Sequence, residues 1–135
     1  MPGCVLRACG EHFDVDAYLA HSGFQPCSVS RRGQPRRVES TRIEKHSGFN
    51  LVVSDADGDK VPLQIREARA FLEAHHPELQ RLREWPGVDS LVLDFGWCFP
   101  VHGNGQWNRF PAHLLRKSGE LGIDIEVSVY AVRED

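Results

Sequence analysis

The stretch SLVLDFGW, residues 90–97, has a large apolar side chain at every second position. The apolar set is Leu91, Leu93, Phe95 and Trp97. Successive side chains of a β-strand point to opposite faces, so this period of two predicts a strand over 88–97 with one buried face. The other face carries Asp94, which predicts that one side of the sheet is partly open to water.

Comparable patterns on either side predict the remaining elements. Further strands are expected at 4–9, 27–30, 49–54 and 123–130, and helices at 11–21, 63–82 and from Pro111 to Gly119 or Gly122. Pro77 cannot lie inside a helix without a kink, so the long helical pattern should break near His76. Gly23 is expected to cap the first helix in a left-handed conformation, and Leu114 and Leu115 are expected to face inward.

This order of elements predicts an α+β domain that spans residues 1–135. Helices should cover one face of a mostly antiparallel sheet. The first six elements match a ferredoxin-like βαββαβ arrangement, and an added αβ pair would extend the sheet.

Composition excludes several classes of function. The 135 residues include 41% hydrophobic and 26% charged residues with a net charge of -3, as in an ordinary globular protein without a general attraction for nucleic acid or anionic lipid. No apolar run approaches the roughly 20 residues that cross a bilayer, and no signal peptide is expected. Four cysteines without CxxC spacing indicate reduced thiols and a cytoplasmic location.

The open face of the sheet is the first candidate site. Its expected outward-facing residues are Arg7, Asn50, Asp94, Asp124, Glu126 and Ser128. Arg7 and Asp94 have opposite charges and would form a cross-strand ion pair if their strands are neighbours. The plain alternative is a solvated face on which such a pair contributes under about 1 kcal/mol. Base-stacking aromatic residues are missing from the central positions, which disfavours RNA binding.

The second candidate is the basic loop RRGQPRR, residues 31–37. Its four arginines are Arg31, Arg32, Arg36 and Arg37. Forked guanidinium groups suit carboxylates and phosphates, and charge clusters steer association with a partner. Residues 31–45 carry +4 and residues 120–135 carry -4, so the alternative is that the arginines bind the acidic C-terminal segment and only fix the loop.

The loop after residue 97 contributes further candidates. Trp97 and Trp107 bracket it and are either interface anchors or core residues. His102 could meet Cys98 as a ligand or a base, but a single C-x3-H pair more often joins an inert thiol and a loop imidazole. No metal site or cofactor is expected.

Five segments in order give the chain a resemblance: FDVDAYLAHSG, RRGQPR, SGFNLVVS, LDFG and LGIDIEVSVY. They resemble small bacterial single-domain proteins of unknown function, some of which are similar to immunity proteins that bind and block a toxin. The resemblance covers nearly the whole chain and implies a binding role. It assigns no catalytic residues.

The sequence therefore predicts a non-catalytic domain that recognises a protein partner through the basic loop, the open sheet face, or both. The alternative is a small-anion-binding protein or enzyme with a site between loops 31–37 and 98–109, where Asp94 or His102 would act as acid or base. The oligomeric state is left open.

Overall fold

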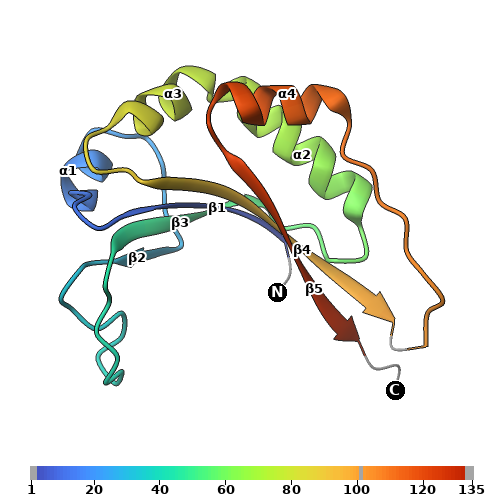
Figure 1. Ribbon diagram of the computed structural model, residues 1–135, viewed down its shortest axis with the longest axis horizontal. Coiled ribbons are helices and arrows are strands. Elements are labelled where there is room, and N and C mark those ends of the chain that lie inside the picture. Colours follow the sequence, from blue (N-terminus) through green and yellow to red (C-terminus); the bar gives the residue numbers. More distant parts are fainter. Residues whose placement is uncertain (1–2, 101, 133–135) are drawn as a thin grey trace.

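The computed structural model describes residues 3–100 and 102–132, and Figure 1 shows how their helices and strands are arranged. Their order is β1 (Cys4–Gly10), α1 (Val15–Ala20), β2 (Ser28–Ser30), β3 (Ser47–Ser54), α2 (Val61–Ala74), α3 (His76–Glu84), β4 (Ser90–Pro100), α4 (Ala112–Glu120) and β5 (Asp124–Val132).

The strands form one five-stranded sheet in the order β2-β3-β1-β4-β5. The pairs β2–β3, β3–β1 and β1–β4 are antiparallel, and β4–β5 is parallel. Parallel neighbours need a crossover connection, and α4 supplies it between β4 and β5. The prediction of an α+β fold with a mostly antiparallel sheet is confirmed, and β5 extends the sheet as expected.

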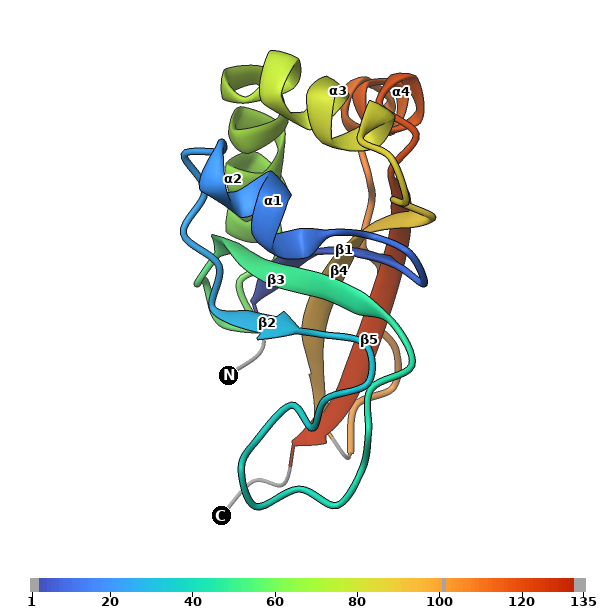
Figure 2. The same cartoon turned by 90° about the vertical axis from the view of Figure 1, so that its left-hand side faces the viewer.

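The helices lie on one side of an arched sheet, and the concave face on the other side is uncovered (Figures 1 and 2). The predicted period of two in β4 accounts for this arrangement, because its apolar residues face the helices. Leu91, Leu93, Phe95 and Trp97 are all buried. Leu6 of β1 and Leu72 of α2 are fully buried in the same layer.

The predicted break in the long helical pattern is confirmed. α2 ends at Ala74, His75 separates the two helices, and α3 begins at His76. Pro77 lies in the first turn of α3, where its missing N–H costs no helical hydrogen bond. The break turns α3 so that Leu79 and Leu82 are also fully buried.

Tyr18 of α1 connects this helix to α3 and to the sheet. Its ring is fully buried and stacks on Phe49 with a centroid separation of 5.8 Å. Its hydroxyl donates to Glu78 at 2.6 Å, and Glu78 also accepts two hydrogen bonds from Arg81. Burial and the neighbouring Glu78 raise the pKa of Tyr18, while the hydrogen bonds from Arg81 lower the pKa of Glu78.

Two local expectations are wrong. Gly23 does not have a positive φ, and the first helix ends instead at the C-cap His21, whose N–H bonds the carbonyls of Leu19 and Tyr18. Leu115 is 47% exposed, whereas Leu114 is fully buried. Consecutive helical residues point about 100° apart, so a nine-residue helix that packs on one face buries one of the two leucines.

β4 is longer than the predicted strand and ends at Pro100 instead of Trp97. Its outer part has backbone partners on both sides. Gly96 N–H donates to Gly3 and Cys98 N–H donates to Gly58, while β5 pairs with the same stretch on the other side. These long-range partners extend the strand into a segment that the Gly and Pro content predicted to be a loop.

None of the helices in the described residues is long and apolar enough to cross a membrane. The four cysteines are free thiols, as expected.

Candidate functional site

The concave sheet face brings together polar residues from four strands. Arg7 of β1 lies opposite Asn50 of β3 and Val92 of β4. Asp94 of β4 lies opposite Glu126 of β5. The predicted neighbourhood of Arg7 and Asp94 is therefore confirmed, and it lies at the centre of the open face.

Asp94 is 5% exposed, although it is on the open face. One of its oxygens accepts a hydrogen bond from the Arg7 guanidinium, and the other accepts from the Ser128 hydroxyl at 2.8 Å. Glu126 adds a second carboxylate at 3.9 Å from Arg7. A buried carboxylate whose two oxygens both accept hydrogen bonds holds Arg7 in place. It is poorly suited to act as a general base, because a general base needs an oxygen free for its substrate.

Two hollows lie on this face and share Arg7. The first has a volume of about 490 Å³ and lies over the outer halves of β4 and β5. Its lining consists of Gly3, Val5, Arg7, Asp94, Gly96, Cys98, Tyr130 and Val132. The second, of about 380 Å³, extends toward the basic loop and is lined by Arg7, Cys9, Ser30, Arg36, Glu44, His46 and Asn50. Because Arg7 lines both hollows, we call the two together the groove.

The basic loop is part of a longer hairpin between β2 and β3, which we call the basic hairpin, residues 31–46. Figures 1 and 2 show it projecting from one end of the sheet. Gly33 N–H donates to the Glu44 carbonyl, Glu44 N–H donates to the Gln34 carbonyl, and Pro35 bridges to Ile43. These backbone contacts give the hairpin a defined shape along its base.

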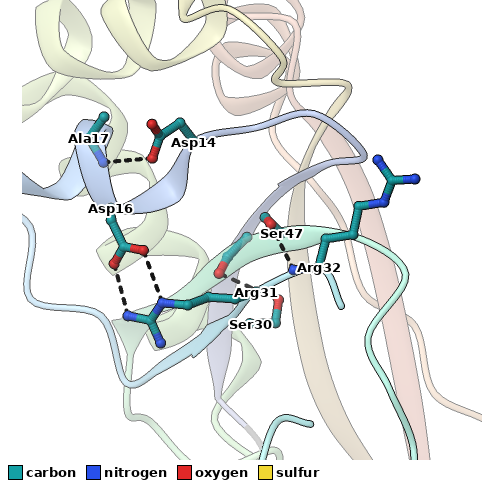
Figure 3. A network of polar contacts seen from close by, with 8 residues as sticks. Asp14, Asp16, Ala17, Ser30, Arg31, Arg32 and Ser47 are labelled. Atoms are coloured by element: carbon teal, nitrogen blue, oxygen red, sulfur yellow. Dashed lines mark hydrogen bonds and ion pairs between the residues drawn. The ribbon is translucent and has the colours of Figure 1, made fainter. Parts of the chain in front are cut away.

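Arg31 fixes the base of the basic hairpin to α1. Its guanidinium makes a two-pronged contact with Asp16, at 2.8 and 3.0 Å, which Figure 3 shows. The hydrogen bonds from Arg31 lower the pKa of Asp16. Asp14, two residues before Asp16, caps α1 by accepting a hydrogen bond from Ala17 N–H at 3.1 Å.

Arg32 fixes the same base from the other side. Its backbone N–H donates to the Ser47 hydroxyl at 2.9 Å, while its side chain points away from Arg31 (Figure 3). The guanidinium lies 3.3 Å from Glu11 and 3.3 Å from the His12 Nδ1. Arg31 and Arg32 are thus both compensated by acids near the first helix.

Arg36 and Arg37 differ in their surroundings. Arg36 pairs with Glu44 inside the hairpin at 3.1 Å and lines the second hollow. Arg37 has no ion-pair partner among the described residues, and neither does Arg42 across the hairpin. Val38 beside Arg37 is 98% exposed. We call Arg37, Val38 and Arg42 the hairpin tip.

The alternative that the arginines bind the acidic C-terminal segment finds no support among the described residues, because their partners are Asp16, Glu11 and Glu44. Glu126 of that segment lies instead beside Arg7. The last two acids, Glu134 and Asp135, lie outside the described residues.

The remaining predicted residues lie apart from the hairpin. Trp97 is 7% exposed and stacks on Phe110 at 5.5 Å, so it belongs to the core. Trp107 is 90% exposed, and His102 is also exposed. Figure 1 shows the basic hairpin and the connection after β4 at opposite ends of the arch, so the structure does not bring loops 31–37 and 98–109 together.

Sequence reasoning missed several residues that line the groove. Arg7 was recognised as half of an ion pair but not as the side chain common to both hollows, and Glu44, His46 and Tyr130 were not singled out. Tyr130 alternates with Val129 in a strand pattern, which was a usable signal. The place of Glu44 follows only from the pairing of the hairpin.

No group of three or more potential metal-ligating side chains occurs within residues 3–100 and 102–132. A family model described as "Domain of unknown function (DUF4279)" matches residues 2–132. No curated protein and no solved structure matches.

Proposed function

We propose that this chain, which belongs to the family described as Domain of unknown function (DUF4279), is a non-catalytic domain that binds a protein partner. The binding surface consists of the hairpin tip and the adjoining half of the concave face. An immunity-like role in the cytoplasm, in which the partner is a toxin, fits this proposal. The observation that carries it is a preorganised hairpin whose basal arginines are compensated while those at its tip face solvent.

The arginines of the hairpin differ in their partners, and this difference supports the proposal. Arg31 and Arg32 form ion pairs with Asp16 and Glu11, which hold the base of the hairpin in position. A loop held in its bound conformation loses less entropy on binding. Arg37 and Arg42 can then pair with carboxylates of a partner, and the exposed Val38 adds an apolar contact.

The groove supports the same conclusion. Its second hollow adjoins the hairpin through Arg36 and Glu44, so a partner that contacts the tip can continue onto the sheet face. The tip and this hollow together offer more cations than acids, which favours an acidic partner surface.

A charge-reversal experiment tests the proposal. A glutamate-rich peptide is titrated into the full chain, and amide chemical shifts are followed by NMR. Shifts should concentrate in the hairpin and the adjoining concave face. Arg37→Glu with Arg42→Glu should weaken binding by about tenfold or more, since each reversed charge repels the probe.

The matched control is Arg66→Glu with Arg116→Glu, which reverses two exposed charges on α2 and α4. This variant should bind the glutamate-rich peptide only slightly more weakly than the wild-type chain, because it changes only the long-range attraction. Equal losses in both double variants, or shifts scattered over the helices, would show that binding is a general charge effect and would refute the proposed surface.

Small-anion binding is a second candidate function, favoured by the second hollow, where Arg7, Arg36 and His46 converge. Inorganic phosphate titrated calorimetrically should then release heat that Arg36→Ala abolishes. An enzyme with a site on this face would also need an acid or base; Asp94, the carboxylate at its centre, is held by Arg7 and Ser128, and His46 is the other candidate within the second hollow.

We also propose that the first six elements form a ferredoxin-like arrangement. The strand order β2-β3-β1-β4 with antiparallel pairing throughout supports this assignment.

A further inference from the structure

The two edges of the sheet are very different. β2 forms one edge and has three residues, whereas β5 forms the other and has nine. Among the described residues β5 pairs only with β4. Its outer side therefore presents a long row of backbone N–H and C=O groups without strand partners.

The outer half of β5 is also apolar and exposed. Val129 is 59% exposed, Tyr130 is 52% exposed and Val132 is 42% exposed. Proline, lysine and bulges are among the usual devices that block an edge, and Asp124–Val132 contains no proline or lysine. Its protection consists of two acids, Asp124 and Glu126, at the inner end.

We propose that β5 pairs antiparallel with β5 of a second copy of this chain, about a two-fold axis at Ser128. This register aligns all nine residues of both strands. It sets Glu126 opposite Tyr130 of the partner subunit and Asp124 opposite Val132 of the partner subunit. Val127 meets Val129 of the partner subunit on the helix side of the sheet.

Like charges disfavour registers centred nearer the inner end of β5, and among the remaining registers the axis at Ser128 is the one that pairs all nine residues. An axis at Glu126 would place that glutamate against its own copy, and an axis at Ile125 would place Asp124 against Glu126. Like charges directly opposite each other destabilise a strand pair. An axis at Ser128 keeps the acids apart and covers each with an uncharged side chain.

β5 of a second copy fits this edge better than β2 of a second copy does. Pairing β5 with the three-residue β2 edge of another molecule would use a third of the length of β5. Such a head-to-tail contact forms a ring or an open chain of molecules instead of a closed pair. The two-fold pair closes, keeps the helices on one side, and sets two concave faces next to each other. It leaves the hairpin tip free, so it does not depend on the proposed partner.

The sign of a charge at Tyr130 tests the dimer, because the proposed pairing places an acid opposite this residue. In sedimentation equilibrium the wild-type chain should form a concentration-dependent dimer. Tyr130→Lys places a cation opposite Glu126 twice in the dimer and should tighten it, whereas Tyr130→Glu should loosen it. The two dissociation constants should differ by about tenfold or more. Val38→Lys and Val38→Glu at the hairpin tip should leave the wild-type constant unchanged.

Cross-linking tests the register. Ser128→Cys brings two thiols together at the axis, where Cα atoms of paired residues are about 4.5–5.5 Å apart and a disulfide can form. Glu126→Cys places its thiols two residues from the axis on each strand, where they cannot reach each other. Mild oxidation should therefore cross-link the first variant above the wild-type level and not the second.

A wild-type chain that stays monomeric over a hundredfold concentration range would overturn the proposal, and an extended segment of another protein would then be the better occupant of the edge. So would Tyr130→Lys and Tyr130→Glu variants with equal dissociation constants. Far-UV circular dichroism establishes that each variant is folded, as the exposure of Tyr130 leads us to expect.

Discussion

The two faces of the same sheet differ in burial and in polarity. On the helix side, Leu6, Leu93 and Phe95 are fully buried, and their side chains have no polar group that needs a hydrogen-bond partner. On the concave side, the alternate residues Arg7 and Asp94 form a charged pair beside two hollows. One set of strands thus supplies stability through apolar burial and leaves the other face available for recognition.

Phe95→Ala should produce the largest effect. Removing a fully buried aromatic ring forfeits its transfer free energy and leaves a cavity, so the free energy of unfolding should fall by about 3–5 kcal/mol. Urea unfolding followed by circular dichroism measures it. The control Val52→Ala lies on the same sheet at 49% exposure and should lose less than about 1 kcal/mol. Comparable losses would mean that the two faces do not differ as described.

Arg7→Ala should produce the next largest effect, although it changes a half-exposed residue on the open face. It leaves the buried Asp94 carboxylate without its cationic partner, and we expect a loss of about 2 kcal/mol in the free energy of unfolding at pH 7. Arg7→Ala combined with Asp94→Asn removes the unpaired charge and should recover part of that loss. Equal stabilities of the single and double variants would show that Asp94 is well solvated.

The periodic patterns made the architecture predictable, but they did not reveal the groove. Alternation in residues 90–97 identified a strand with one covered face, and Pro77 located the helix break to within one residue, because both signals are local. The pairing of Arg31 with Asp16 and of Arg36 with Glu44 depends on which segments the fold brings together. Composition marked the arginines as a cluster, and only the tertiary structure separates the fixed ones from the exposed ones.

Tyr18→Phe should have a smaller effect whose size depends on pH. At pH 7 the variant loses the hydrogen bond to Glu78 and about 1 kcal/mol of stability. The folded pKa of Tyr18 is raised above its ordinary value of 10.0, so the wild-type chain loses stability as the pH rises above about 10, and the variant does not lose this contribution. The gap between the two proteins should therefore narrow at high pH.

The acid side has the opposite sign. The pKa of Glu78 is lowered below its ordinary value of 4.5, so its contribution is present above that pH and is lost as the pH falls below it. Arg81 is the main cause and remains in the variant, so Tyr18→Phe should reduce this acid loss only partly. Urea unfolding midpoints of both proteins, measured at a series of pH values, test the alkaline and the acid effect. A constant gap between the proteins from neutral to alkaline pH would contradict the assignment.

Arg31→Ala should change stability least, because its pair with Asp16 is exposed to solvent, and we expect a loss of under about 1 kcal/mol. Its effect should be local. The pKa of the Asp16 carboxyl, lowered by the hydrogen bonds from Arg31, should return toward its ordinary value of 3.8 in an NMR titration. Arg37→Ala, which leaves that contact intact, is the matched control and should leave this pKa unchanged. If the base of the hairpin depends on Arg31, amide exchange should also quicken at Gly33 and Glu44, whose backbone groups bond there, and Arg37→Ala should leave it slow.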